Sequence, residues 1–291
     1  MAIVRYRPLD NSHPRLGWLE DGYIRAFPDD AGYSSPQQLL QHPLDAIRST
    51  VRALRESDIE AVSLDDVALF APIDVQEVWA AGVTYKRSRD ARMEESTEQS
   101  VYDRIYVAER PELFLKGTAR RIVGPGGTIT IRSDSTWDVP EPELTLVVNR
   151  HHEVIGYTVG NDVSSRSIEG ENPLYLPQAK IYTGSGAMGP VIALRDEIDD
   201  PQALTIDLAI ERDEAIVFEG TTSTAEMHRN VDELATWLHR GNVFPDGVFL
   251  MTGTGIVPPD DFSLEEGDTV RITIAGIGTL ANRVAVLDVD S

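Results

Sequence analysis

The chain has 291 residues, of which 41% are hydrophobic and 25% charged, a composition typical of a folded protein with its own core. It contains no cysteine, which excludes disulfides, thiolate metal sites and cysteine nucleophiles. Its 48 acidic and 26 basic side chains give a net charge of −22, which argues against nucleic acid or an anionic membrane as partner because the surface repels their phosphates.

Two further features predict where the protein works. Residues 1–10 lack the apolar core of a secretory signal, and no run of about 18 apolar residues is present to span a membrane, so we expect a cytoplasmic protein. Only Lys86, Lys116 and Lys180 are lysines. An acidic, lysine-poor surface suits a cytoplasm rich in salt, where ions screen the self-repulsion. A GC-rich genome would explain the missing lysines but not the charge.

Residues 1–70 are predicted to form a small α+β domain. Ala2–Tyr6 and Tyr23–Phe27 are short apolar runs typical of strands. Ser35 and Pro36 have the residue types of a helix N-cap and of the first helical position. A second helical stretch carries apolar side chains at helical spacing: Leu44, Ile47, Val51 and Leu54.

Residues 71–291 are predicted to form a β-rich domain, in which glycine-rich turns between apolar runs favour antiparallel pairing. The predicted strands are Val78–Val83, Leu113–Lys116, Thr128–Ile131, Leu144–Val148, Val154–Val159, Leu204–Ile210, Ala215–Phe218, Val248–Thr252, Val270–Ile274 and Val284–Val289.

Two predicted helices interrupt these strands. The charged stretch Arg87–Val107 is either a lid over a site or a solvated surface helix. The second helix is predicted to begin at a capping box, Ser223 and Glu226, and to end before Gly241. Its predicted buried face consists of Val231, Leu234, Ala235 and Leu238.

The segment Pro140–Leu144 contains the strongest local signal. In extended backbone residues i and i+2 share a face, so Glu141 and Glu143 place two carboxylates side by side. Such a pair repels unless a cation lies between them, and oxygen ligands suit a hard divalent ion such as Mg²⁺, Mn²⁺ or Ca²⁺. The alternative is a solvated acidic strand edge.

Three more polar residues follow within 40 positions. Asp162 ends the strand of the sequence G-Y-T-V-G-N-D and could complete a carboxylate triad, which Arg166 could orient. Lys180 is the last lysine of a chain that avoids lysine. The alternatives are a turn residue for Asp162 and an ordinary surface base for Lys180.

These segments, E-P-E-L-x-L-V-V, G-Y-T-V-G-N-D-V-S-S-R and Q-A-K, resemble the fumarylacetoacetate hydrolase superfamily over about residues 76–290. The resemblance implies an α+β, β-rich fold: a mixed β-roll catalytic domain behind the small N-terminal domain. It also implies a homodimer or homotetramer. One divalent cation per subunit, usually Mg²⁺, is implied on Glu141, Glu143 and Asp162, where it chelates a 2-oxo acid.

The resemblance also implies roles for other residues. Lys180 matches a lysine that faces the reacting carbons, and Thr254, or its neighbour Thr252, is implied to bind the substrate carboxylate. Hydrolases of the superfamily usually carry a His–Glu pair that activates water, but Ser88 and Ala91 stand at those positions here. This departure argues against hydrolysis of a C–C bond.

Ser88, with Arg87 and Arg89 beside it, is instead predicted to bind the substrate. Arg87 and Arg89 are suited to binding an anion, since a guanidinium makes bidentate contacts with a carboxylate. The segments G-V-T-Y-K-R-S-R-D-A-R, E-R-P-E-L-F-L-K and I-E-G-E-N-P-L-Y-L-P-Q-A-K resemble a narrower branch, the 2-keto-3-deoxy-pentonate dehydratases of the arabinonate or xylonate type. Glu112 matches the catalytic glutamate of this branch.

The implied function is therefore a hydro-lyase that converts a 2-keto-3-deoxy sugar acid into 2-oxoglutarate semialdehyde in oxidative pentose breakdown. Lys180 and Glu112 would act as base and acid, in an order that the sequence leaves open. One alternative is a hydrolase or isomerase of the same superfamily that acts on an acylpyruvate or diketo acid. A second alternative is a non-catalytic module that binds a sugar acid.

Overall fold

The main β-sheet runs through both the N-terminal segment and the rest of the chain. A computed structural model describes residues 1–9, 13–28, 32–95 and 104–288. The strands of its larger sheet are β1 (Ala2–Pro8), β2 (Arg15–Glu20), β3 (Tyr23–Ala26), β4 (Ala61–Ser63), β5 (Val67–Phe70), β6 (Glu77–Gly82), β7 (Glu112–Thr118), β8 (Ile122–Val123), β11 (Pro142–Val148), β12 (Val154–Asp162), β14 (Gly186–Leu194) and β17 (Val248–Met251).

These strands follow the order β4-β3-β2-β1-β14-β12-β11-β17-β6-β7, with β5 beside β1 and β8 beside β14. Most pairs are antiparallel, but β17 is parallel to β6 and β14 to β8, so the sheet is mixed. Backbone hydrogen bonds join β1 of the segment of residues 1–70 to β14, which in turn pairs with β12, one of the strands that carry the acidic residues.

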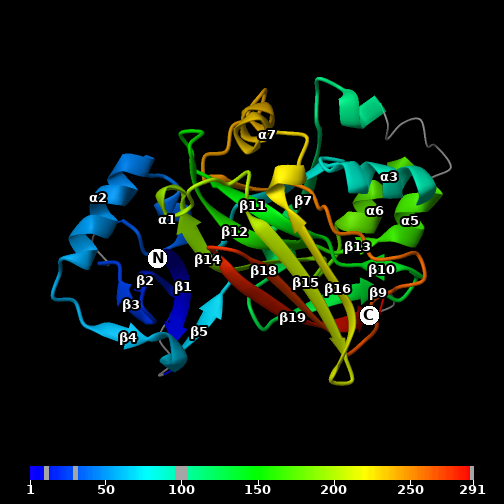
Figure 1. The fold of residues 1–291 in the computed structure, drawn as a ribbon. Coiled ribbons are helices and arrows are strands. Elements are labelled where there is room, and N and C mark those ends of the chain that lie inside the picture. Colours follow the sequence, from blue (N-terminus) through cyan, green and yellow to red (C-terminus); the bar gives the residue numbers. More distant parts are fainter. Residues whose placement is uncertain (10–12, 29–31, 96–103, 289–291) are drawn as a thin grey trace.

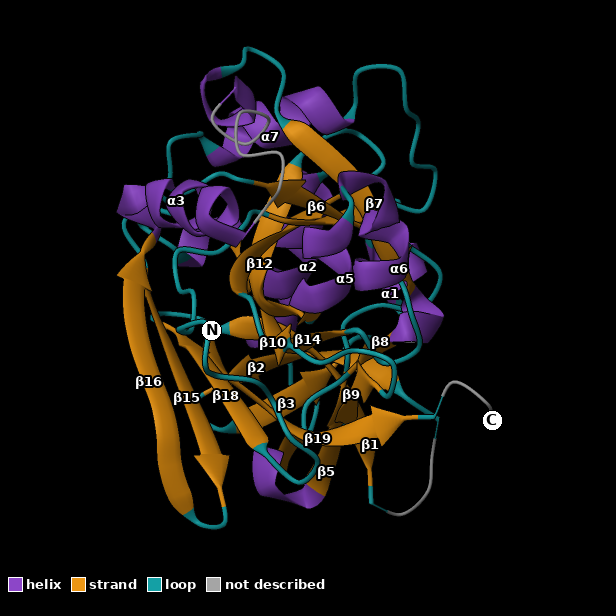
Figure 2. Cartoon of the chain, turned by 90° about the vertical axis from the view of Figure 1, so that its right-hand side faces the viewer, coloured by secondary structure: helices purple, strands orange, loops and turns teal. Residues whose placement is uncertain are grey.

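A second sheet packs against the first. It has the order β16-β15-β18-β19-β9, and Figure 2 shows β15, β16 and β18 side by side along one edge of the molecule. Two short strands, β10 and β13, pair separately. The bounds of these strands are β9 (Thr128–Arg132), β10 (Asp138–Val139), β13 (Ser164–Ser165), β15 (Thr205–Arg212), β16 (Ala215–Ser223), β18 (Thr269–Ile274) and β19 (Gly278–Leu287).

The core lies on both faces of the larger sheet. Leu144 and Leu146 of β11 belong to the apolar cluster that includes Leu208 of the second sheet, whereas Val147 belongs to a cluster with Ile47 of the helix α2 (Leu44–Arg55). The side chains of a strand alternate between faces, so β11 is buried on both sides. This burial fixes the position of β11, and Glu141 and Glu143 lie at the start of this strand.

The helices are short and lie outside the sheets. Besides a short helix at residues 104–107, the described residues contain α1 (Pro36–Leu39), α2 (Leu44–Arg55), α3 (Lys86–Glu95), α5 (Arg166–Glu171), α6 (Leu176–Lys180) and α7 (Val231–Leu238), with 3₁₀ turns η2 (Leu64–Asp66), η3 (Ala119–Arg121), η4 (Pro173–Tyr175), η5 (Arg195–Glu197) and η6 (Thr224–Glu226). In Figure 1, α3, α5 and α6 cluster on the right-hand side of the molecule, away from α2 on the left.

Several sequence predictions for helices are confirmed, and one is wrong. Ser35 caps α1, and its hydroxyl accepts the N–H of Gln38 as expected. Ser223, however, caps only the turn η6, and α7 begins later with Asn230 as its N-cap. The capping pattern was misleading because β16 extends to Ser223 and leaves room for a single turn only. The predicted apolar face of α7 is buried as expected.

The predicted helix over residues 87–107 is divided. The structure has α3 and a short helix at residues 104–107, and residues 96–103 lie outside the described part of the chain. Among the described residues, no helix has the length and apolar character needed to cross a bilayer.

Candidate active site

Three buried carboxylates meet where β11 and β12 lie side by side. Glu141 immediately precedes β11, Glu143 is in β11, and Asp162 ends β12. The two strands are antiparallel, and the backbone N–H of Asp162 donates to the carbonyl of Glu141 over 3.0 Å. One oxygen of each carboxylate lies within 4.8 Å of the others. The three residues are at most 4% exposed, which rules out a solvated strand edge.

Two of the predicted cations contact this acidic cluster, Glu141, Glu143 and Asp162. The ammonium of Lys180 donates to Oε2 of Glu141 over 2.7 Å and to Oδ2 of Asp162 over 3.2 Å. The guanidinium of Arg166 donates to Oε1 of Glu141 over 2.9 Å. Lys180 is 2% exposed, so it is not a surface base. Arg166 is 2% exposed and contacts Glu141, one member of the triad that the sequence suggested it could orient.

A third cation, Lys116 of β7, was not predicted as part of the site. Its ammonium is fully buried, lies 2.6 Å from Oδ1 of Asp162 and donates to the carbonyl of Val163 over 3.0 Å. Burial lowers the pKa of Lys116, and the neighbouring Asp162 opposes this effect. The scarcity of lysine was the available signal, because two of the only three lysines in the chain meet at this cluster.

Glu143 is the carboxylate of the acidic cluster whose surroundings favour a divalent cation. Burial, together with the charges of Asp162 and Glu141, raises the pKa of Glu143 well above its usual range, and the N–H of Gly253 opposes this by donating to Glu143 over 2.6 Å. A cation among the three carboxylates would relieve this repulsion. A set of ligands consisting only of oxygen suits Mg²⁺.

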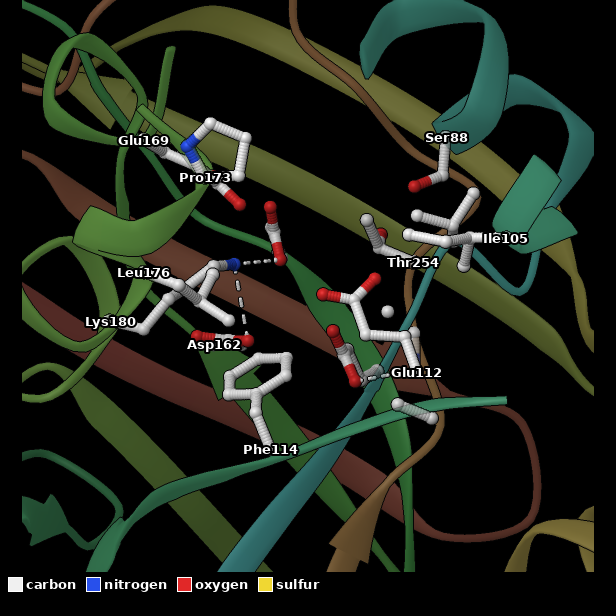
Figure 3. A pocket seen from close by; sticks show the side chains of 16 residues that line it. Ser88, Ile105, Glu112, Phe114, Asp162, Glu169, Pro173, Leu176, Lys180 and Thr254 are labelled. Carbon is white, nitrogen blue, oxygen red and sulfur yellow. Dashed lines mark hydrogen bonds and ion pairs between the residues drawn. The ribbon is translucent and has the colours of Figure 1, made fainter. Parts of the chain in front are cut away.

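A cavity opens beside the acidic cluster, and Figure 3 shows Glu112 and Lys180 on opposite sides of it. Glu112 comes from β7 and pairs with Gly82 of β6. A side chain at position 82 would overlap the carboxylate of Glu112, so Gly82 provides the space that Glu112 occupies. The other described residues of the wall are Ala81, Val83, Ser88, Ile105, Phe114, Glu169, Pro173, Leu176, Gly253 and Thr254.

Of the residues predicted to bind the substrate, some line the cavity and others do not. Ser88 and Thr254 line the cavity. Thr252 is buried beside it, with its hydroxyl donating to the carbonyl of Leu144. Arg87 is exposed, and Arg89 forms an ion pair with Asp90 over 2.6 Å. Neither arginine is among the described residues of the cavity wall.

Comparison with known proteins identifies the family. The model of the fumarylacetoacetate (FAA) hydrolase C-terminal family matches residues 77–285. The chain belongs to this family. A "probable 2-keto-3-deoxyxylonate dehydratase" of Haloferax volcanii is 45% identical over 92% of the chain and 90% of its own length. A 2-dehydro-3-deoxy-D-arabinonate dehydratase of Saccharolobus solfataricus is 45% identical over 97% of the chain and 92% of its own length.

A solved structure of this family has the same fold. It is described as 2-keto-3-deoxy-D-arabinonate dehydratase complexed with magnesium and 2,5-dioxopentanoate, and it is similar to this chain with a TM-score of 0.83 and 36% identity. The match covers 99% of this chain and all of the other. The predicted fold, α+β and β-rich with mixed sheets, is thereby confirmed.

Proposed function

We propose that this protein dehydrates a 2-keto-3-deoxy-pentonate, of the arabinonate or xylonate type, to 2,5-dioxopentanoate, which is 2-oxoglutarate semialdehyde. The main observation that supports this proposal is the cavity, where Lys180 and Glu112 face each other beside a buried acidic cluster. The dehydratases at 45% identity support this choice of reaction.

Glu141, Glu143 and Asp162 would hold one divalent cation, and Mg²⁺ fits their oxygen ligands. When bound, the cation polarises the C2 ketone of the substrate and thereby acidifies the C3 protons. Arg166 and Lys116 keep Glu141 and Asp162 in place from the buried side of the cluster.

Lys180 and Glu112 would perform the proton transfers. One removes a proton from C3, and the other protonates the C4 hydroxyl so that it leaves as water. The contacts of Lys180 with Glu141 and Asp162 hold its ammonium at the cavity wall. Ser88 and Thr254 are positioned to contact the substrate, and Thr252 supports the backbone next to Thr254.

Arg87 and Arg89 would bind the substrate carboxylate only if α3 shifts, since Arg89 now pairs with Asp90.

We further propose that the protein is a homodimer or homotetramer, and light scattering tests this proposal. The net charge of −22 supports our proposal that it works in a cytoplasm rich in salt.

Product analysis by NMR tests the proposed function. With Mg²⁺ and a 2-keto-3-deoxy-pentonate we expect 2,5-dioxopentanoate, and with an acylpyruvate no reaction. Ser88 and Ala91 cannot activate water, since serine is too weak a base and alanine has no polar group. Lys180→Met and Glu112→Gln should each lower the rate by about 100-fold or more. Release of pyruvate from the acylpyruvate would instead support the hydrolase alternative.

A further inference from the structure

The cavity has a fifth carboxylate among its described residues, Glu169, which has no role in the steps above. Glu169 lies on α5, is only 6% exposed and lines the same cavity as Lys180 and Glu112. The helix begins at Arg166, whose guanidinium binds Glu141, and residues three apart share a helix face. The contact that anchors α5 to the acidic cluster therefore also presents Glu169 to the cavity.

Glu169 lines the cavity next to Lys180, one of the two residues proposed to transfer protons. In the view of Figure 3, the ammonium of Lys180 lies between Asp162 and Glu169. If a cation at the acidic cluster held C1 and C2 of the substrate, C3 and C4 would lie between Lys180 and Glu112. The remaining carbon, C5, would then be free to extend toward Glu169.

The proposed reaction needs a proton transfer at C5. Loss of water yields 5-hydroxy-2-oxopent-3-enoate, whose C3=C4 double bond is conjugated with the ketone. A proton then leaves C5, the electrons of that C–H bond form C4=C5, and the electrons of C3=C4 take up a proton at C3. The resulting enol loses its hydroxyl proton and gains one at C4. C5 is oxidised and C4 reduced within one molecule, so no external oxidant is needed.

We propose that Glu169 is the base that removes the C5 proton, an inference that rests on the proposed dehydration. The group that took the first C3 proton returns it to C3. Glu169 then delivers its own proton to C4, and the group that protonated the leaving hydroxyl takes the proton of the enol. Lys180, Glu112 and Glu169 all return to their starting states, so the three groups balance the protons of one turnover.

Glu169→Gln tests this assignment, because glutamine keeps the size of the side chain but is not a base. We expect loss of water from the substrate to continue at nearly the wild-type rate, whereas formation of 2,5-dioxopentanoate slows by about 100-fold. The conjugated enone then accumulates and is detected by its ultraviolet absorbance and by NMR. Glu169→Asp keeps a carboxylate and should therefore restore part of the rate at which 2,5-dioxopentanoate forms. Glu171→Gln, on the exposed side of the same helix, is the matched control.

A second measurement separates this inference from the proposed function. Exchange of the C3 protons of pyruvate with D₂O needs only the group that removes a proton from C3. Glu169→Gln should therefore leave the rate of this exchange unchanged. If the wild type dehydrates the substrate but the variant forms 2,5-dioxopentanoate as fast, or is slowed equally in loss of water and in formation of 2,5-dioxopentanoate, the role of Glu169 is refuted and the proposed function stands. If the wild type forms no product from any pentonate epimer, the proposed function fails and this inference fails with it.

Discussion

At the scale of single residues, the three carboxylates of the acidic cluster differ in the partners that stabilise their charge. Glu141 binds Lys180 and Arg166, and Asp162 binds Lys180 and Lys116, whereas Glu143 accepts a backbone N–H. The pKa of Glu143 is raised as a result of burial and of its acidic neighbours. Glu143 is therefore the carboxylate whose charged form gains most from a cation.

This imbalance predicts the effect of Glu143→Gln. The variant should lose Mg²⁺ binding in calorimetry and should be inactive, because one of three charged ligands is gone. Its metal-free form should melt no lower than the wild type, since glutamine can still accept the N–H of Gly253 and carries no charge that must be buried. EDTA should inactivate the wild type reversibly. Full activity of metal-stripped wild type would contradict the assignment.

Lys116 predicts a different effect on stability. Lys116→Met leaves Asp162 with one cation fewer in a fully buried site, and breaking a buried ion pair costs about 3 kcal/mol. We expect urea unfolding of the metal-free variant to show a loss of this size, and Mg²⁺ to restore more stability to the variant than to the wild type. Lys86→Met, at an exposed lysine, is the control. Equal unfolding midpoints for Lys116→Met and wild type would refute the structural role.

At the scale of elements, the parts of the site that lie close in sequence could be predicted. The i,i+2 spacing of Glu141 and Glu143 and the strand end at Asp162 are local patterns, and the hairpin of β11 and β12 brings them together. The role proposed for Glu112 rests on a resemblance, because no local pattern links β7 to this hairpin. The structure shows that β7 reaches the cavity through its pairing with β6.

The residues that sequence reasoning missed depend on long-range contacts. Lys116 reaches Asp162 across 46 positions of sequence, and Glu169 faces the cavity because Arg166 anchors α5 to Glu141. Neither contact leaves a periodic signal. The start of α7 was missed for a related reason, since the extent of β16 is set by pairing with β15.

The helix α3 predicts a change on ligand binding. Ser88 of α3 lines the cavity while the neighbouring Arg87 points to solvent, so a small shift of the helix would bring an arginine to a substrate carboxylate and exclude water. Hydrogen exchange in Lys86–Glu95 should slow when Mg²⁺ and pyruvate are added, whereas exchange in α7 should not change. Equal exchange in α3 with and without ligand would contradict a lid.

At the scale of the whole molecule, the main feature is the excess of negative charge. Arginines form many surface ion pairs, such as Arg48 with Asp45 and Asp196, and Arg195 with Asp232. Even if every base were paired, 48 acidic and 26 basic groups would leave 22 acidic groups unmatched. Surface pairs contribute little to stability, so the excess charge opposes the folded state at low ionic strength.

This excess predicts that the protein is most stable in concentrated salt. The Debye length falls to about 3 Å at 1 M salt, so repulsion between the surface carboxylates is then largely screened. The melting temperature should rise as KCl increases from low to molar concentrations. NaCl at equal ionic strength should act equally if screening is the cause, and chloride salts are preferred because sulfate also strengthens apolar burial. A flat or falling melting temperature would show that the acidic composition is not an adaptation to salt, and a large difference between KCl and NaCl would point to binding of a specific ion.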